Sequence, residues 1–191
     1  MSHGPLPNRR VHAIHDLRLD GMFELTMRCR GASVLDLGCN TGLVALEFAQ
    51  CGARLVHGLD LSPGSIQTAR DFFVELHVQH QFEAGDLTTG PACLAPFGDA
   101  GYDIVCLLGT YHKIKRPPSK NYIRMGARGM DAEELSELMV HLGRRTLRYF
   151  AFRGDLEDFD QVDADMATAG LHRVLFSTLS QLGPCGIWER G

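Results

Sequence analysis

Short apolar runs alternate along this chain with longer stretches in which apolar residues recur every three or four positions. The short runs predict strands and the periodic stretches predict helices. Their alternation is typical of a parallel sheet covered by helices. Strands are expected at residues 33–37, 54–59, 81–84, 102–108, 146–152, 171–178 and 185–189.

Local signals mark where several helices begin and end. Ser62 and Pro63 have the residue types of an N-cap and a first-turn proline. A longer helix is expected to begin at Asp131 and to end near Arg145, with acidic residues in its first turn and arginines in its last. A short helix is expected at residues 161–169. The last two strands should form a hairpin, because the roughly six residues between them are too few for a crossover helix.

The composition fits one folded domain. The chain has 191 residues, of which 45% are hydrophobic and 22% charged, and these are ordinary values for a soluble globular protein. No apolar run approaches the roughly 18 residues of a membrane span. The amino-terminal sequence lacks the apolar stretch of a secretory signal, so we expect a cytoplasmic protein. The six cysteines form no C-x-x-C pair, which favours reduced thiols and no metal site.

Charge is unevenly distributed. The net charge is −4, which disfavours nucleic-acid binding by the whole molecule. Residues 113–128 nevertheless contain six basic side chains and no acidic one. This basic segment is either a solvated surface loop or a clamp for phosphate, carboxylate or an RNA backbone. An acidic run at residues 155–160 is interpreted mainly as a solvated helix entry, with a cation or metal as the alternative.

The strongest functional signal is the sequence VLDLGCNTG at residues 34–42. A strand here enters a glycine turn that begins a helix, where backbone N–H groups face a ligand. Dinucleotide sites use G-x-G-x-x-G, whereas here three residues with side chains separate Gly38 from Gly42. Asp36 adds a carboxylate that repels phosphate and suits an ammonium or sulfonium group. The turn therefore favours a nucleoside without phosphates.

Two further carboxylates follow the next strands. Asp60 ends the second strand 22 residues after Gly38, where an acid accepts hydrogen bonds from ribose hydroxyls. Asp86 follows the third strand, where an acid can accept from the exocyclic amine of adenine. The carboxyl ends of parallel strands meet at one edge of a sheet, so we expect these groups to line one crevice.

This combination resembles the Rossmann-like S-adenosylmethionine-dependent methyltransferases. VLDLGCNTG, Asp60, the Gly85–Asp86 pair and the strand YDIVCLLG are similar to motifs I to IV of that family, over residues 31–108. The resemblance implies a three-layer α/β sandwich with a mostly parallel seven-stranded sheet whose last strand is antiparallel. It also implies S-adenosylmethionine as the cofactor and S-adenosylhomocysteine as the product.

The resemblance also implies a set of donor-binding residues. Its members are Asp36, Gly38, Cys39, Asn40, Gly42, Asp60, Leu61, Gly85, Asp86, Leu87, Leu108 and Gly109. The residues of the glycine turn would surround the methionyl part, and Asp60 would hold the ribose. Leu61 would lie against the adenine, with Asp86 on its amine. Leu108 and Gly109 would lie under the sulfonium.

The sequence says less about the methyl acceptor than about the methyl donor. Methyl transfer from a sulfonium relies mainly on proximity and orientation, and a base is needed only for a weakly acidic acceptor. His112 follows the fourth strand and is a candidate base, with Tyr111 beside it; the alternative is that both only pack the loop. The fourth strand is followed neither by N/D-P-P-Y, which would resemble exocyclic-amine methyltransferases, nor by Pro-Cys, which would resemble the pyrimidine C5 type, so the resemblance disfavours both kinds of acceptor.

Little chain remains for a separate acceptor-binding domain. We expect a single domain over residues 1–191, with a catalytic core from residue 31 and a basic insertion at 113–130. Residues 9–30 have helical spacing and are expected to form a lid over the donor. The acceptor would then be selected by this lid, by the basic insertion or by a partner subunit.

The sequence therefore predicts an S-adenosylmethionine-dependent methyltransferase that acts on a small, anionic molecule. One alternative is an RNA or tRNA methyltransferase that uses the basic segment, and its binding would weaken steeply with salt. A second is a non-catalytic domain that binds the donor. A nicotinamide dehydrogenase is disfavoured by the side chains of Asn40 and Thr41. Neither the acceptor atom nor the oligomeric state follows from the sequence.

Overall fold

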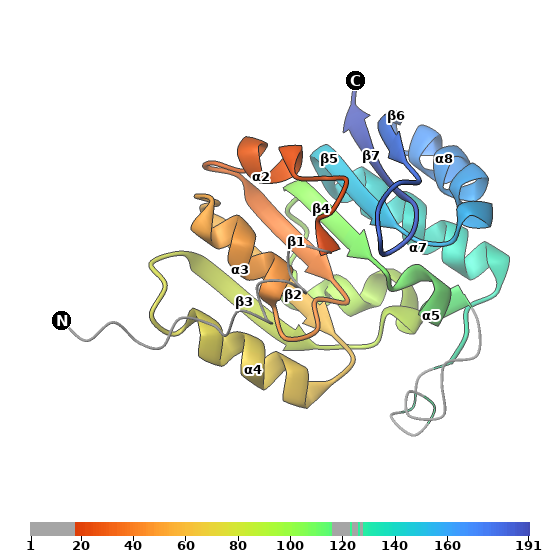
Figure 1. Ribbon diagram of the computed structural model, residues 1–191. Helices are drawn as coiled ribbons and strands as arrows, with labels where there is room; N and C mark the ends of the chain where they lie inside the picture. The colour runs from red at the N-terminus through yellow and green to blue at the C-terminus, as the bar shows by residue number, and fades with distance from the viewer. Residues whose placement is uncertain (1–17, 116–122, 124–125, 127) are drawn as a thin grey trace.

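A seven-stranded sheet forms the centre of the molecule (Figure 1). The computed structural model describes residues 18–115, 123, 126 and 128–191. The strands are β1 (Ser33–Leu37), β2 (Leu55–Asp60), β3 (Gln79–Ala84), β4 (Tyr102–Leu108), β5 (Thr146–Arg153), β6 (Leu171–Ser177) and β7 (Cys185–Arg190). Their order is β3-β2-β1-β4-β5-β7-β6, and β7 runs antiparallel to both neighbours. The predicted fold class and the terminal hairpin are confirmed.

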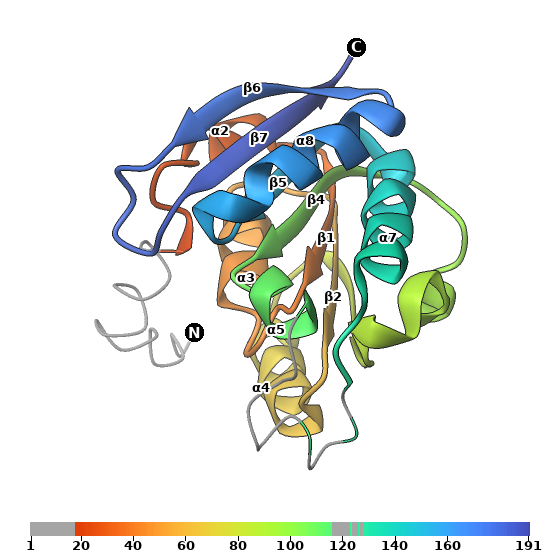
Figure 2. The ribbon, with the colours of Figure 1, turned by 90° about the vertical axis from the view of Figure 1, so that its right-hand side faces the viewer.

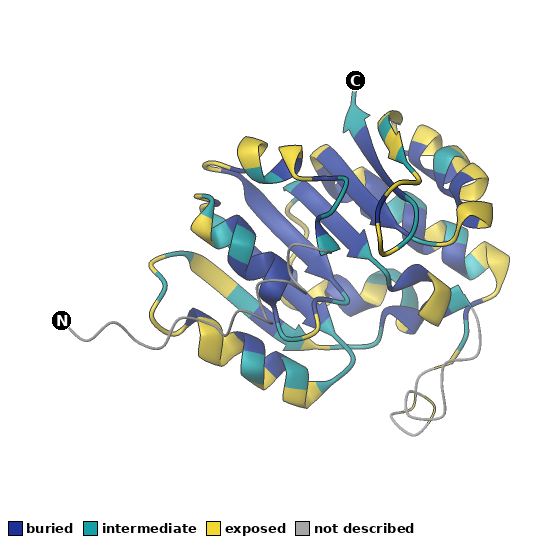
Figure 3. Ribbon diagram, in the orientation of Figure 1, coloured by how far each residue is buried: buried dark blue, intermediate teal, exposed yellow. Residues whose placement is uncertain are grey.

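Helices cover both faces of the sheet (Figures 1 and 2). One face packs against α2 (Glu24–Arg28), α3 (Leu43–Gln50) and α4 (Pro63–Phe73). The other packs against α5 (Tyr111–Lys115), α7 (Ala132–Arg145), α8 (Phe159–Thr168) and the 3₁₀ segment η1 (Leu87–Phe97), with the short η2 (Leu156–Asp158) before α8. The inner strands β1, β4, β5 and β7 are largely buried, whereas the edge strands β3 and β6 are more exposed (Figure 3). In the described part of the chain, no helix has the length and apolar character that crossing a membrane requires.

The predicted helix starts at Ser62 and Asp131 are confirmed. The Ser62 hydroxyl accepts a hydrogen bond from the backbone of Ser65 at 3.2 Å, and Pro63 is the first residue of α4. Asp131 and Glu134 form a reciprocal capping box at the start of α7. η1 was not predicted, because its prolines and Gly90 look like a loop in the sequence, although they permit the tight turns of a 3₁₀ helix.

The amino-terminal segment differs from the expected long helix. Residues 9–17 of that prediction lie outside the described residues, and between residues 19 and 30 only α2 is helical. Gly21 has a φ of +81°, and a Cβ there would lie 2.8 Å from the Sγ of Cys185. The chain therefore turns sharply at Gly21, and Leu19 and Met22 on either side of it are fully buried.

Both described ends of the basic segment carry ion pairs. The ammonium of Lys115 pairs with Asp158, whose side chain is 1% exposed, and lies 3.6 Å from the carboxylate of Glu157. Arg128 donates two hydrogen bonds to Glu134, at 2.7 and 2.9 Å. The acidic run at residues 155–160 was interpreted mainly as a solvated helix entry, but two of its residues, Glu157 and Asp158, pair with Lys115 of α5.

Replacing Lys115 by methionine is expected to lower the free energy of unfolding by about 1–3 kcal/mol, because Asp158 would keep a buried charge without its cation. Urea unfolding followed by circular dichroism measures the change. Arg128→Met is the matched control, since its pair with Glu134 is exposed and solvent screens it, so the loss of stability should be smaller. Equal losses in the two variants would contradict the role of burial.

Candidate functional site

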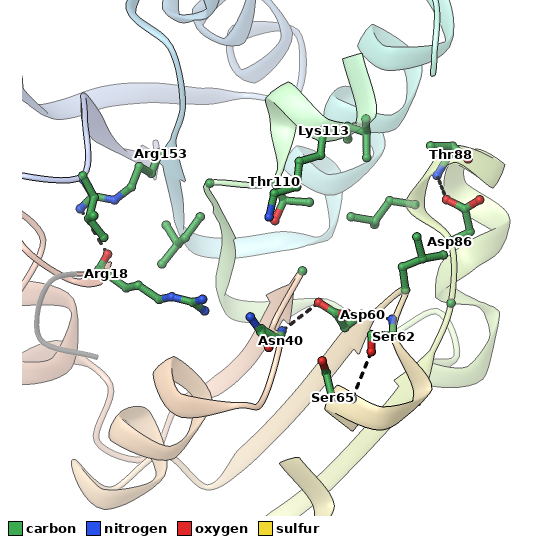
Figure 4. A pocket seen from close by; sticks show the side chains of 18 residues that line it. Arg18, Asn40, Asp60, Ser62, Ser65, Asp86, Thr88, Thr110, Lys113 and Arg153 are labelled. Carbon is green, nitrogen blue, oxygen red and sulfur yellow. Dashed lines mark hydrogen bonds between the residues drawn. The ribbon is translucent and has the colours of Figure 1, made fainter. Parts of the chain in front are cut away.

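A pocket of about 290 Å³ lies at the carboxyl ends of the parallel strands. It opens where β1 and β4 lie side by side, although the chain leaves these two strands toward opposite sides of the sheet. Open α/β sheets bind their ligands at such a switch point. Figure 4 shows the side chains that line this pocket, and they come from widely separated segments of the chain.

The glycine turn after β1 forms one wall. Gly38, Asn40 and Gly42 have φ angles of +72°, +52° and +75°, so the turn needs three left-handed residues within five positions. The backbone N–H groups of Gly38 and Cys39 donate to the carbonyl of Leu59 at 2.8 and 3.0 Å. The turn is therefore fixed to the end of β2, with Gly38 and Asn40 facing the pocket.

Asp60 joins this turn to the next helix. Its two carboxylate oxygens accept hydrogen bonds from the backbone N–H groups of Asn40 and Ser62, both at 2.9 Å. Asp60, Leu61 and Ser62 line the pocket, and so does Ser65 on the first turn of α4. A carboxylate has about four acceptor positions, so Asp60 retains capacity to bind a ligand.

The segment after β3 supplies a second carboxylate. Asp86 accepts a hydrogen bond from the backbone of Thr88 at 2.8 Å and thereby caps η1. Gly85, Asp86, Leu87 and Thr88 all line the pocket. A Cβ at Gly85 would lie 2.7 Å from a methyl group of Leu59, so glycine here allows the two strand ends to pack closely.

The segment after β4 forms the opposite wall. Leu108, Gly109, Thr110, Lys113 and Ile114 line the pocket. Gly109 has a φ of +68°, and a Cβ there would meet no atom within 4 Å. The backbone of this segment thus borders open space, which a ligand can enter.

The two candidate catalytic side chains take other positions. Tyr111 is 2% exposed, and its ring packs edge-on against Phe152 with centroids 5.3 Å apart. Burial raises the pKa of the Tyr111 hydroxyl above its ordinary value. His112 is exposed and does not line the pocket. Neither Tyr111 nor His112 lines the pocket, whereas the neighbouring Thr110, Lys113 and Ile114 do.

Three of the expected donor-binding residues lie behind the pocket wall rather than on it. Cys39 is 1% exposed, and Gly42 begins α3 against the Cβ of Ala69. Asp36 is 2% exposed, and one of its carboxylate oxygens has no hydrogen-bond partner. Burial raises the pKa of Asp36 to about 7, and the nearby positive charge of Arg18 opposes the rise. The other expected donor-binding residues line the pocket.

The pocket also contains residues that the sequence did not single out. Arg18, Arg153 and Leu182 line it from three distant parts of the chain. Figure 4 shows the side chain of Arg18 pointing toward Asn40. Arg153 ends the otherwise largely apolar β5, and a charge in that position is the one signal that the sequence offered. The described residues contain no cluster of three His, Cys, Asp or Glu side chains suited to a metal ion.

The fold and the pocket define a Rossmann-like α/β domain with its ligand site at the switch point of the sheet. A family model described as a methyltransferase domain matches residues 34–131, about half of the chain. The chain belongs to this methyltransferase family, which confirms the family resemblance seen in the sequence.

Individual relatives share shorter or weaker similarity. A ubiquinone biosynthesis O-methyltransferase from Bordetella avium is 34% identical over 109 residues, which cover 57% of this chain and 43% of that protein. A ribosomal protein L11 methyltransferase from Laribacter hongkongensis is 40% identical over 58 residues, covering 30% of this chain and 20% of that protein. The chain thus matches less than half the length of these curated relatives.

Solved structures support the same fold. A magnesium protoporphyrin IX methyltransferase from Synechocystis, with S-adenosylmethionine bound, has a TM-score of 0.64 and 18% identity, and covers 100% of this chain and 87% of its own. An amino pentose methyltransferase from Micromonospora echinaspora, also with S-adenosylmethionine bound, has a TM-score of 0.66 and 14% identity, with full coverage of both chains. At these identities the likeness concerns the fold.

Proposed function

We propose that this protein binds S-adenosylmethionine in the pocket at the carboxyl end of the sheet and methylates a small, anionic acceptor. The observation that carries the proposal is the position of Asp60 and Asp86 on one pocket wall, after neighbouring strands. Carboxylates accept hydrogen bonds from ribose hydroxyls and from the amine of adenine. Leu61 and Leu87 provide apolar contacts for the base between them.

The pocket suits a nucleoside without phosphates. The side chain of Asn40 stands where a diphosphate would need bare backbone, and the two carboxylates would repel it. The open space beside Gly109 leaves room for a ligand along the end of β4. These features fit an adenosine group whose 5′ substituent extends along the glycine turn.

Charges at the other end of the pocket complement an amino acid group. Arg18 lines the pocket near Asn40, and the buried Asp36 lies behind the turn with one oxygen free of hydrogen bonds. The methionyl part of the donor has a carboxylate and an ammonium group. Arg18 would bind the carboxylate, and Asp36 would attract the ammonium group from below.

The chain's own residues would orient the reaction. When bound, S-adenosylmethionine supplies a methyl group on a sulfonium, which is already activated for displacement. Thr110 and Lys113 lie on the wall formed by the end of β4 and α5, and Leu182 adds an apolar surface. We assign these three residues to the acceptor, with Lys113 attracting its negative charge. They would align the acceptor and exclude water.

The relatives support a small acceptor without identifying it. They include a ubiquinone biosynthesis O-methyltransferase and a magnesium protoporphyrin IX methyltransferase, and also a ribosomal protein L11 methyltransferase. In the described part of the basic segment, Lys115 and Arg128 pair with acids of this chain. That pairing weakens the case for an RNA acceptor, so we favour a small molecule.

Isothermal calorimetry tests the donor site. S-adenosylhomocysteine is expected to bind at least about tenfold more tightly than NAD or ATP, because both carry phosphates that the turn disfavours. Asp60→Asn, which keeps one acceptor oxygen, should weaken this binding less than Asp60→Ala. Equal affinity for NAD and S-adenosylhomocysteine would refute the donor assignment.

Transfer of labelled methyl groups to pools of small metabolites or of RNA tests the acceptor. Transfer to an anionic small molecule, lost in Lys113→Met with donor affinity retained, is the expected result. Labelling confined to RNA would favour the nucleic-acid alternative. Donor binding without transfer to either pool would favour a binding domain.

A further inference from the structure

We propose that Arg153 is a positioning residue that holds two distant segments against the pocket, one with Arg18 and the other with Leu182. The inference rests on the proposed donor site and adds a role that lies outside the residues contacting adenosine. Arg153 would act through Arg18, and so would control how the methionyl end of the donor is bound.

The contacts of Arg153 join three parts of the chain. It is the last residue of β5 and is 3% exposed. Its Nη1 donates to the hydroxyl of Ser180 and to the carbonyl of Gly183, the latter at 2.8 Å. Its Nη2 donates to the carbonyls of Arg18 and Asp20, at 3.2 and 2.5 Å. One guanidinium thus links the end of β5 to residues 18–20 and to the β6–β7 loop.

This arrangement places a cation where burial is costly. Burial lowers the pKa of Arg153 from its ordinary value. Among the described residues, no carboxylate forms an ion pair with its guanidinium, and its Nε has no hydrogen-bond partner. Burying a cation whose hydrogen-bond acceptors are all neutral costs free energy. Because Arg153 lies on the pocket wall, we attribute this unfavourable burial to a role in ligand binding.

The two held segments also contact each other. The backbone N–H of Gln181 donates to the carboxylate of Asp20 at 3.1 Å. Arg18 and Leu182 each lie within two residues of these contacts, and both line the pocket. Figure 4 shows Arg153 hydrogen-bonded to the backbone of Arg18, while the Arg18 side chain extends toward Asn40. Arg153 therefore adds side-chain hydrogen bonds from the end of β5 to both segments.

The residues assigned to adenosine are independent of this link. Asp60 and Asp86 are held by hydrogen bonds from backbone N–H groups within their own turns and from the glycine turn. Loss of the Arg153 contacts should therefore weaken only the part of donor binding that uses Arg18. A purely structural role would instead lower stability and weaken all ligands equally.

Two ligands that differ only at the methionyl end separate these possibilities. S-adenosylhomocysteine carries the amino acid group, and 5′-methylthioadenosine lacks it. In Arg153→Lys, which keeps the charge but loses the planar fork, we expect the affinity for S-adenosylhomocysteine to fall about tenfold, as when one charge-assisted hydrogen bond is lost. The affinity for 5′-methylthioadenosine, measured by the same calorimetry, should change less than about twofold.

Arg190 provides a matched control. It also donates to three backbone carbonyls, those of Thr146, Ala169 and Gly143, and it does not line the pocket. Arg190→Lys should lower stability without separating the two ligands. An equal loss for both ligands in Arg153→Lys, or the same pattern in both lysine variants, would overturn the proposal.

A double-mutant cycle tests whether Arg153 acts through Arg18. Arg18→Ala should also weaken S-adenosylhomocysteine about tenfold, and adding Arg153→Lys should cost little more. Fully additive losses would show that the two residues act separately and would overturn the proposal. If the wild-type protein binds neither ligand, the proposed function itself fails, which is a different result.

Hydrogen exchange tests the same link in the wild-type protein, so the result does not depend on whether a variant folds. Saturation with S-adenosylhomocysteine is expected to slow exchange of the backbone amides of residues 180–183, because Arg18 and this loop share one guanidinium. Saturation with 5′-methylthioadenosine should leave these amides unchanged. Equal protection by both ligands, or by neither, would contradict the link.

Discussion

Replacing Gly38 by alanine is expected to abolish measurable donor binding and to lower the free energy of unfolding by about 2–4 kcal/mol. Alanine at a φ of +72° is strained, at a cost of roughly 1–2 kcal/mol. The added Cβ would also lie 2.0 Å from the hydroxyl of Thr110, which is 8% exposed and has little room to move. The turn would therefore shift, and with it Asn40 and its hydrogen bond to Asp60.

Gly31 offers a control for the backbone strain alone. It has the same φ of +72°, but a Cβ there would meet no atom within 4 Å. Gly31→Ala should lower stability by about 1–2 kcal/mol and leave the affinity for S-adenosylhomocysteine unchanged. Combining Gly38→Ala with Thr110→Ala should restore part of the stability by removing the nearest atom. If Gly38→Ala and Gly31→Ala behave alike, close packing of the turn on Thr110 is not what the site requires.

Local sequence signals were sufficient to predict which residues line the side of the pocket proposed to bind adenosine. Asp60 and Asp86 follow strands that hydrophobic patterning locates well, and parallel pairing brings the ends of such strands together. The seven strands of the sheet were predicted for the same reason, although β3 begins at Gln79 rather than Gln81. Each of these inferences depends on residues close together in the sequence.

The methionyl and acceptor sides depend on contacts between distant residues. Arg18 and Leu182 line the pocket from two segments that both accept hydrogen bonds from Arg153, and these two positions are 164 residues apart in the sequence. No local pattern encodes such a contact. The sequence analysis also did not predict that residues 111–115 form the helix α5. Helical spacing carries Thr110 and Lys113, three residues apart, to the pocket, while Tyr111 turns toward Phe152.

Asp36 gives a prediction in which stability and binding depend on pH in opposite directions. Burial raises its pKa from 3.8 to about 7 in the folded protein. The folded state therefore holds a proton that the unfolded state releases between these two values. The contribution of Asp36 to the free energy of unfolding is fully present below about pH 4 and is lost as the pH rises to about 7. The total loss is at most about 4 kcal/mol.

The variant Asp36→Asn removes this titration while nearly preserving shape. Urea unfolding at about pH 4.5 and about pH 8 should show that the stability of the variant relative to wild type increases with pH by about 2–4 kcal/mol. Thr88→Val is a control for substitution at a buried polar group without a charge, since its hydroxyl also has no partner. A stability difference between variant and wild type that does not change with pH would show that the charged carboxylate is well satisfied in the fold.

Binding should follow the opposite course, because only the ionised carboxylate attracts the ammonium group of the methionyl end. The affinity of the wild-type protein for S-adenosylhomocysteine is expected to rise about tenfold between pH 6 and pH 8, and that of Asp36→Asn to remain flat. For 5′-methylthioadenosine, which has no ammonium group, both proteins should be insensitive to pH over this range. A common pH dependence for the two ligands would place the titrating group on the adenosine side. The buried carboxylate thus destabilises the folded protein above neutral pH, at the place where the ammonium group of the proposed donor would carry a compensating positive charge.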